Sequence, residues 1–227
     1  MKKLSQKINT YLEIGQKRTF AGAIDWPGWC RSGQDEESAL QALLDYGPRY
    51  QRILSRSRLG FQASTDVSKL VVVERLKGNA TTDFGAPAVA TSIDSKPVDS
   101  DELHSFEKIL NACWRTFVKS VKTAEGESLR AGPRGGGRQV KGIVGHVLES
   151  NAGYLSSLGW KLQKDQADDL EQMRKTILSA VRASARGEMP AKGPRGGLRW
   201  TARYFVRRLS WHILDHAWEI EDRMVSE

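Results

Sequence analysis

The feature that most constrains the fold of this chain is a change of hydrophobic period near Asp99. Before it, short runs rich in β-branched and aromatic residues read as strands, and the valine-rich segment 69–76 is the strongest of them. After it, apolar residues recur at helical spacing. A chain of 227 residues is long enough for two small cores. We therefore predict an α+β protein with one domain over residues 1–95 and another over residues 96–227.

The first domain is predicted to be a small α/β unit. Two strands are expected within residues 10–25, around a Gly-Gln-Lys-Arg turn, followed by turn and loop residues at 26–34. Asp35 and two glutamates then open a helix, because carboxylates cap the first amides and meet the positive end of the helix dipole. Gly47 and Pro48 are expected to interrupt this helix, which resumes over residues 50–54.

The segment 77–97 is rich in Gly, Ala, Thr, Ser and Pro, and this composition predicts a loop or linker. Beyond it, amphipathic stretches predict four long helices. Helices of this length and pattern are typical of a bundle. Their expected ranges are 99–122, 139–158, 164–185 and 198–224.

Composition excludes several classes of protein. With 39% hydrophobic and 27% charged residues the chain resembles an ordinary globular protein, and no segment has the roughly 20 apolar residues of a membrane span. The N-terminus lacks the apolar stretch of a signal peptide, so we expect a cytoplasmic protein without a membrane partner. The net charge of +8 permits a nucleic-acid partner, but no binding motif accompanies it, and a solvated basic surface is the favoured interpretation. Cys30 and Cys113 are expected to be reduced.

An internal repeat precedes two of the expected helices. Residues 132–136 and 193–197 both read GPRGG, and an arginine follows each, Arg138 and Arg199. Glycine-rich turns at helix starts expose amides that bind anions. No lysine and serine of a phosphate loop follow, so we favour plain loops.

Three of the four histidines predict a metal site. His212 and His216 are four residues apart, so on a helix both imidazoles lie on one face. His146, among apolar residues of the second helix, supplies a third nitrogen. Three protein ligands with one open position are typical of catalytic zinc. Taken singly, each histidine also fits a solvated or core position, and the combination is what favours the metal.

Two further residues are candidates for catalysis. Glu149 lies three residues after His146, on the same helical face, where it fits a ligand, a ligand-orienting group or a general base, and equally an exposed glutamate. Arg208 lies one turn before His212, where its guanidinium would bind an anionic substrate carboxylate. The remaining arginines of this helix, Arg199, Arg203 and Arg207, predict a solvated basic stripe.

The histidine segments resemble a known superfamily. The stretch RWTARYFVRRLSWHILDHAWEIEDR is similar to the last helix of the DinB/YfiT-like superfamily, and VKGIVGHVLESNAGYL is similar to its second helix. The resemblance covers residues 99–227. It implies an up-and-down four-helix bundle with a divalent metal, zinc or nickel most often, on His146, His212 and His216. Members include metal hydrolases and thiol-dependent S-transferases, which implies a low-molecular-weight thiol as a further cofactor.

The front domain resembles the HicB-like fold. The likeness rests on Trp26, Pro27 and Gly28, which make an aromatic-Pro-Gly turn after a strand, with a second short strand and the acidic-capped helix following. HicB-like domains act as antitoxins or partner-binding modules. This domain has no histidine, so we interpret it as a cover for the bundle or a homodimer surface.

Two classes of function follow. The first is a metal-dependent hydrolase or thiol S-transferase acting on a small, anionic substrate, with Glu149 as base and Arg208 as anion clamp. The second is a non-catalytic regulatory or partner-binding protein, antitoxin-like or associated with nucleic acid, in which the metal is structural. A third alternative is that the histidines bind no metal.

Overall fold

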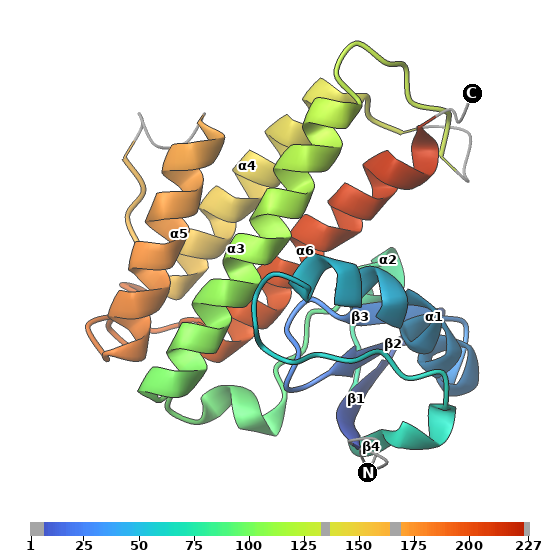
Figure 1. Ribbon diagram of the computed structural model, residues 1–227. Helices are drawn as coiled ribbons and strands as arrows, with labels where there is room; N and C mark the ends of the chain where they lie inside the picture. Colours follow the sequence, from blue (N-terminus) through green and yellow to red (C-terminus); the bar gives the residue numbers. More distant parts are fainter. Residues whose placement is uncertain (1–6, 133–136, 164–168, 225–227) are drawn as a thin grey trace. The chain divides into compact units, whose positions relative to one another are not determined.

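The structure, a computed structural model, describes residues 7–132, 137–163 and 169–224. The chain forms two compact units, Met1–Lys96 and Pro97–Glu227, which we call the N-terminal and C-terminal units. The first contains a four-stranded sheet and the second contains helices, so the protein is α+β (Figure 1).

The N-terminal sheet has the order β3-β2-β1-β4. Strand β2 (Thr19–Ala23) pairs antiparallel with both β1 (Ile8–Ile14) and β3 (Cys30–Gly33). Strand β4 (Leu70–Lys77) pairs parallel with β1. Strand β3 lies in the segment whose composition predicted turn and loop, and only the HicB-like resemblance implied a strand there. Its four residues are too few to show an alternating pattern, and backbone pairing with β2 holds them extended.

Helix α1 (Glu36–Leu54) packs on the sheet as one uninterrupted helix. The expected break at Gly47 and Pro48 is wrong, because the helix continues through both residues. Gly47 is buried against Ala63 and the ring of Trp29, and Trp29 Nε1 donates to the Leu43 carbonyl at 2.8 Å. These tertiary contacts help the helix to continue through a residue that lacks an amide hydrogen.

The segment 77–97 is not a linker. It contains α2 (Ala80–Phe84) and a short 3-10 helix (Ser92–Ser95), and a further 3-10 helix (Val67–Lys69) precedes β4. The carboxylate of Glu13, which is fully buried in β1, accepts hydrogen bonds from Thr82 and from the amides of Ala88 and Val89. Residues 82–89 therefore belong to the folded unit, because the buried Glu13 carboxylate needs the hydrogen-bond donors that they supply.

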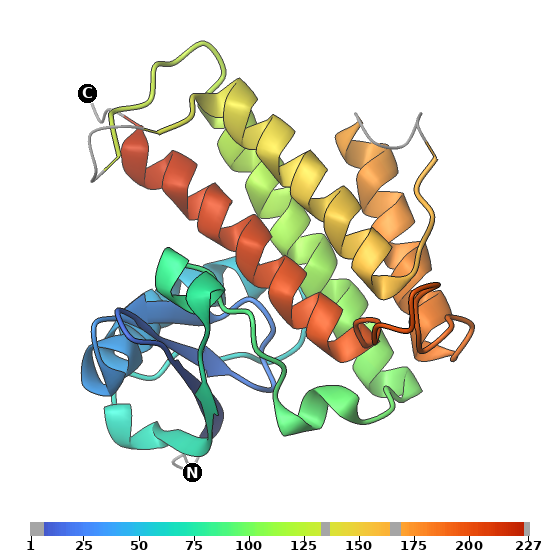
Figure 2. The same ribbon diagram turned by 180° about the vertical axis from the view of Figure 1, so that it is seen from behind.

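Four helices pack in the C-terminal unit, and these are α3 (Ser100–Thr123), α4 (Val140–Leu158), α5 (Leu170–Ala185) and α6 (Ala202–Arg223). Figure 2 shows α4 and α6 side by side. The third helix begins six residues later than expected, and residues 164–168 of its predicted range lie outside the described residues. The other bounds agree with the predicted ranges within about four residues.

The helix directions differ from an alternating up-and-down bundle. Glu102 pairs with Arg203 and Ser120 bonds Glu221, so α3 and α6 run parallel. Asn111 bonds Arg174 near the start of α5, and Glu107 pairs with Arg182 near its end, so α5 runs antiparallel to α3. Since α4 also opposes α6, the consecutive helices α4 and α5 are parallel (Figure 1).

This topology is permitted by the length of the α4–α5 connection. It has eleven residues, 159–169, which reach roughly 35 Å when extended. A 16-residue helix such as α5 is only about 24 Å long. The chain can therefore return along the bundle before α5 begins.

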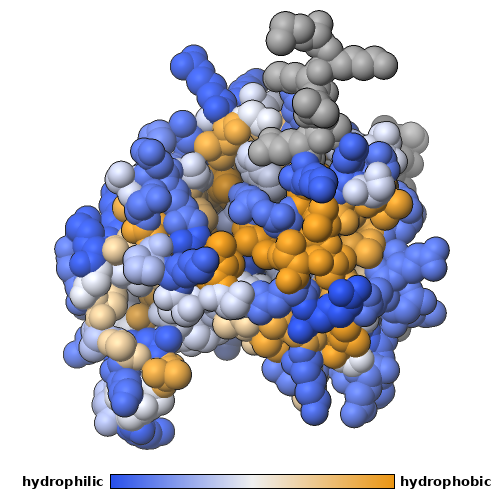
Figure 3. Space-filling view, turned by 90° about the horizontal axis from the view of Figure 1, so that it is seen from below, coloured by the Kyte–Doolittle hydropathy of each residue, from blue (hydrophilic) through white to orange (hydrophobic). Residues whose placement is uncertain are grey.

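Apolar side chains also reach the surface. Figure 3 shows them gathered on one face of the N-terminal unit. On the edge strand β4, Val73 is 53% exposed. Among the described residues, no helix is both long and apolar enough to cross a membrane.

Candidate metal centre

Helix α6 is the most deeply buried element of the C-terminal unit. It starts at Thr201, whose hydroxyl accepts the amide of Tyr204, and most of its residues are buried on every side. Several of these buried residues are polar or charged, namely Arg207, Arg208, Ser210, His212 and Arg223. Burying such groups costs free energy unless partners or ligands compensate it. A buried helix with this composition indicates a functional site.

The three predicted histidines meet where α6 faces α4. His146 comes from α4, and His212 and His216 come from α6, one turn apart. The ring of His146 lies 5.2 Å from that of His212 and 4.9 Å from that of His216, while the two α6 rings are 4.6 Å apart. One nitrogen from each ring lies within 4.8 Å of the others. We call these residues the three-histidine group.

The closest contact in the group has the spacing of two metal ligands. Nε2 of His146 and Nε2 of His212 are 3.3 Å apart. Two nitrogens bound to one tetrahedral zinc at its usual bond length lie about 3.3–3.4 Å apart. Two neutral imidazoles with facing lone pairs repel one another, so a proton or a cation between them is needed. The donor set therefore fits a divalent metal.

Burial keeps His146 and His212 in the form that binds metal. Burial, with smaller effects from the neighbouring His216 and Arg138, lowers the pKa of His146. The pKa of His212 is lowered well below its ordinary value, first by burial and then by the charges of His216 and Arg208. A lowered pKa means that protons compete less with a metal for the ring nitrogens. His212 Nδ1 is buried and has no hydrogen-bond partner among the described residues.

His216 is oriented by a carboxylate that sequence reasoning missed. Glu219 Oε2 lies 2.8 Å from His216 Nδ1, and Glu219 Oε1 accepts from Arg223 at 2.6 Å. Burial raises the pKa of Glu219, but hydrogen bonds from His216 and Arg223 outweigh burial and hold that pKa below its ordinary value. This leaves Nε2 of His216 as the nitrogen available to a metal, the arrangement common for histidine ligands. The position of Glu219, three residues after His216 on the same helix, was the sequence signal that could have identified it.

Arg223 anchors this carboxylate at the end of α6. Its Nε donates to the Arg130 carbonyl at 2.8 Å and its Nη1 donates to the Arg138 carbonyl at 2.9 Å. Segments before and after residues 133–136 are thereby tied to α6. The pair Glu219 and Arg223 is held by backbone as well as by charge.

The two candidate catalytic residues have different surroundings. Glu149 is exposed on α4, and although its charge favours protonation of His146, it is not a member of the three-histidine group. Arg208 is only 9% exposed, and its guanidinium carbon lies 5.0 Å from the ring of Tyr154 and 4.6 Å from that of Trp211. Arg208 is therefore close to the group, whereas Glu149 lies outside it.

The predicted basic stripe is wrong for two of its three arginines. Arg203 pairs with Glu102 and bonds the Pro97 carbonyl, and Arg207 is 6% exposed. Arg207 is buried and Arg203 is largely covered because most of α6 is buried, which a count of charges along the helix does not show. Arg199 is half-buried and bonds backbone carbonyls of Ser156 and Lys192.

The GPRGG repeat does not form two comparable sites. Residues 193–197 close a turn in which Gly193 and Gly197 are hydrogen-bonded, and four residues, 198–201, separate this turn from the start of α6. This agrees with the interpretation as a plain loop. In the other copy, residues 133–136 lie outside the described residues.

Both cysteines are buried thiols, and burial raises the pKa of Cys113 to about 12.

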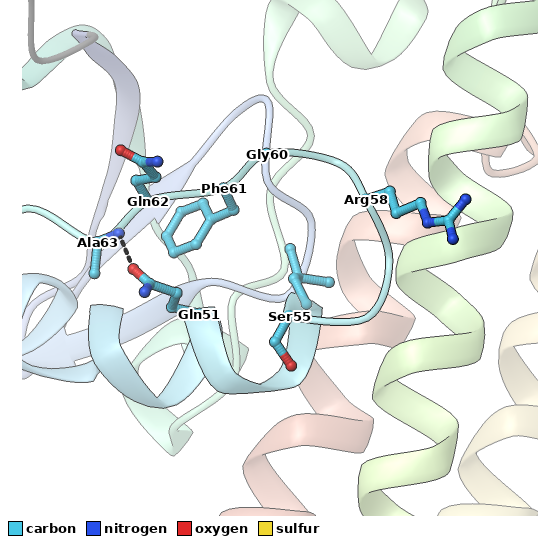
Figure 4. Close-up of a pocket in the computed structure, with 8 residues that line it drawn as sticks. Gln51, Ser55, Arg58, Gly60, Phe61, Gln62 and Ala63 are labelled. Atoms are coloured by element: carbon cyan, nitrogen blue, oxygen red, sulfur yellow. Dashed lines mark hydrogen bonds between the residues drawn. The ribbon is translucent and has the colours of Figure 1, made fainter. Parts of the chain in front are cut away.

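A separate hollow of about 540 Å³ lies in the N-terminal unit (Figure 4). It is lined by the end of α1, by Arg58 and by residues 60–63, and the side chain of Gln51 accepts a hydrogen bond from the Ala63 amide at 2.6 Å. Its lining contains no carboxylate, histidine or cysteine. The groups needed for acid–base or metal chemistry are in the three-histidine group instead.

Comparison with known proteins gave no relative. The chain matches no protein-family model, no curated protein and no solved structure.

Proposed function

We propose that the C-terminal unit is a divalent-metal-dependent enzyme, a hydrolase or a thiol-dependent S-transferase of the DinB-like kind, with the three-histidine group as its metal site. The observation that carries this proposal is the geometry of the ring nitrogens, with two of them 3.3 Å apart and all three within 4.8 Å. The order of the histidines is compatible with the DinB-like resemblance, whereas the parallel course of α4 and α5 departs from the up-and-down order that this resemblance implies.

The number of ligands supports catalysis over a purely structural metal. Among the described residues, the group contains three histidines and no carboxylate or thiolate. Structural zinc sites are closed by four protein ligands, whereas catalytic sites keep one position open. A divalent metal bound here would lower the pKa of water or of a thiol toward neutrality and so supply a nucleophile.

The residues around the group have distinct tasks in this proposal. Glu219 holds His216 in one tautomer, and Arg223 holds Glu219. Burial keeps His146 and His212 neutral and able to donate lone pairs. Glu149 is the candidate base at the exposed side, one helical turn from His146.

The test is metal analysis of the full chain purified without a histidine tag. We expect about one equivalent of zinc or nickel in the wild type and none in the double variant His212→Ala/His216→Ala. His104→Ala is the matched control, because His104 is exposed on α3 and outside the group. A metal-bearing wild type is then assayed with ester, amide and thiol-transfer substrates.

Two results would contradict the proposal. One is a wild type that stays metal-free after reconstitution with zinc and nickel. The other is a bound metal that survives the double variant. The alternative then is a partner-binding protein, with the HicB-like resemblance of the N-terminal unit as its basis.

A further inference from the structure

Beside the three-histidine group, α6 holds a guanidinium that has no acidic partner in the part of the chain that the structure describes. Arg208 is 9% exposed, and its Nη1 is buried with no hydrogen-bond partner among the described residues. Two other arginines of this helix do have acidic partners: Arg203 pairs with Glu102, and Arg223 pairs with Glu219. A buried charge without a counter-ion costs free energy, so its presence in this place needs a compensating partner.

Aromatic rings surround Arg208 without satisfying its hydrogen-bonding capacity. Its guanidinium carbon lies over the rings of Tyr154 and Trp211, at 5.0 Å and 4.6 Å from their centroids. Ring faces stabilise the charge, but they do not accept the in-plane N–H bonds as an anion does. The centroid of the Tyr154 ring also lies 5.5 Å from that of His212, so the same aromatic ring is a neighbour of both Arg208 and His212.

The charges around the group favour an anion. Arg208 and a divalent metal are both cationic, and imidazoles that bind a metal carry no charge. Glu219, the acidic residue bonded to the group, is already engaged with His216 and Arg223. An anionic group bound between Arg208 and the metal would therefore be attracted by both.

We propose that Arg208 forms an anion subsite next to the three-histidine group, and that the substrate carries a carboxylate which this guanidinium binds while another part of the substrate reaches the metal. The inference rests on the proposed metal site and adds the substrate class. One guanidinium binds a carboxylate or a phosphate bidentately, but its single positive charge balances the one charge of a carboxylate and not the nearly two charges of a phosphate, so a carboxylate is favoured. Phosphate sites typically add free backbone amides at a helix start, and Arg208 lies within α6.

The experiment compares dicarboxylates with their monoamides on cobalt-loaded full-length protein. Malonate, succinate and glutarate are each titrated against the monoamide, with cobalt absorption and heat of binding as readouts. For at least one chain length we expect the wild type to prefer the dicarboxylate by about tenfold or more. In Arg208→Met the preference should fall to within about twofold, with cobalt content unchanged.

The controls separate charge from position. Arg186→Met removes one positive charge from an exposed arginine paired with Glu188, and it should keep the full preference. Arg208→Gln is the second neutral variant, used if Arg208→Met does not fold. A preference that survives in both neutral variants, or is absent from the wild type at every chain length, overturns the subsite. Inorganic phosphate binding more tightly than any dicarboxylate, and only with Arg208 present, overturns the carboxylate assignment.

Failure of the metal site itself is recognised separately, because the wild type would then contain no cobalt. In that case the metal-free protein is melted with and without succinate. A succinate-dependent rise in melting temperature that Arg208→Met abolishes supports the anion subsite without the metal. The anion subsite is overturned if succinate changes the melting temperature equally in the wild type and in Arg208→Met, or not at all in the wild type.

Discussion

The replacement Glu219→Gln tests how the three-histidine group is held in place. Glutamine has the size of glutamate, but it carries no charge for Arg223 and is a weaker acceptor for His216. The change therefore removes orientation without opening a cavity. In the structure, Glu219 spans these two partners at 2.8 Å and 2.6 Å.

The expected magnitude follows from these contacts. Loss of a group that orients a ligand typically lowers metal affinity about 10- to 100-fold, which corresponds to roughly 1.4–2.8 kcal/mol. The metal-free protein should also lose about 1–2 kcal/mol of its free energy of unfolding. Breaking a fully buried ion pair costs about 3–5 kcal/mol, but the Glu219 side chain is 31% exposed and Arg223 keeps two backbone acceptors.

The assay is competition of the protein with a zinc chelator, together with thermal unfolding of the metal-free and zinc-loaded forms. The matched control is Glu171→Gln on α5, because Glu171 also pairs with an arginine, Arg174, at 2.6 Å on a helix but lies at the surface. The control should change zinc affinity less than twofold. In the His216→Ala background, Glu219→Gln should have no further effect on affinity.

An orienting role of Glu219 is refuted if Glu219→Gln keeps the zinc affinity of the control while its metal-free form is destabilised. Glu219 would then support the end of α6 without orienting His216. Equal losses of affinity in the wild-type and His216→Ala backgrounds would also refute it, since Glu219 would be acting through another residue.

Three further predictions concern stability and reactivity. Cys113, whose pKa burial raises to about 12, should resist alkylation at pH 8 in the native protein and react once denaturant is added; rapid native labelling at this position would contradict its burial. Glu13→Gln should lower the free energy of unfolding by about 2–3 kcal/mol in urea titrations, because three donors to a buried carboxylate lose a charged acceptor. Gly22→Ala should cost about 1–3 kcal/mol, since an added Cβ would lie 2.4 Å from the ring of Tyr11. Its control, Gly153→Ala on the exposed face of α4, meets no atom within 4 Å and should stabilise by about 0.5–1 kcal/mol; equal effects of the two changes would contradict the packing argument.

The sequence by itself determined the elements with strong local signals. The four long helices and the strands β1, β2 and β4 were predictable because period and propensity act within one segment. The meeting of His146 with His212 and His216 followed from helical spacing together with the DinB-like resemblance. No comparison with known proteins tests that resemblance, so it stays a prediction.

Tertiary structure decided the features in which distant residues provide partners. Pro48 remains inside α1 because the helix packs around Trp29, and the segment after β4 folds because Glu13 needs its amides. The parallel course of α4 and α5 depends on a connection whose path no local pattern specifies. Burial of Arg208 and the bonds of Glu219 likewise arise only when α6 is covered, because whether a charge is solvated or buried depends on neighbours far away in the chain.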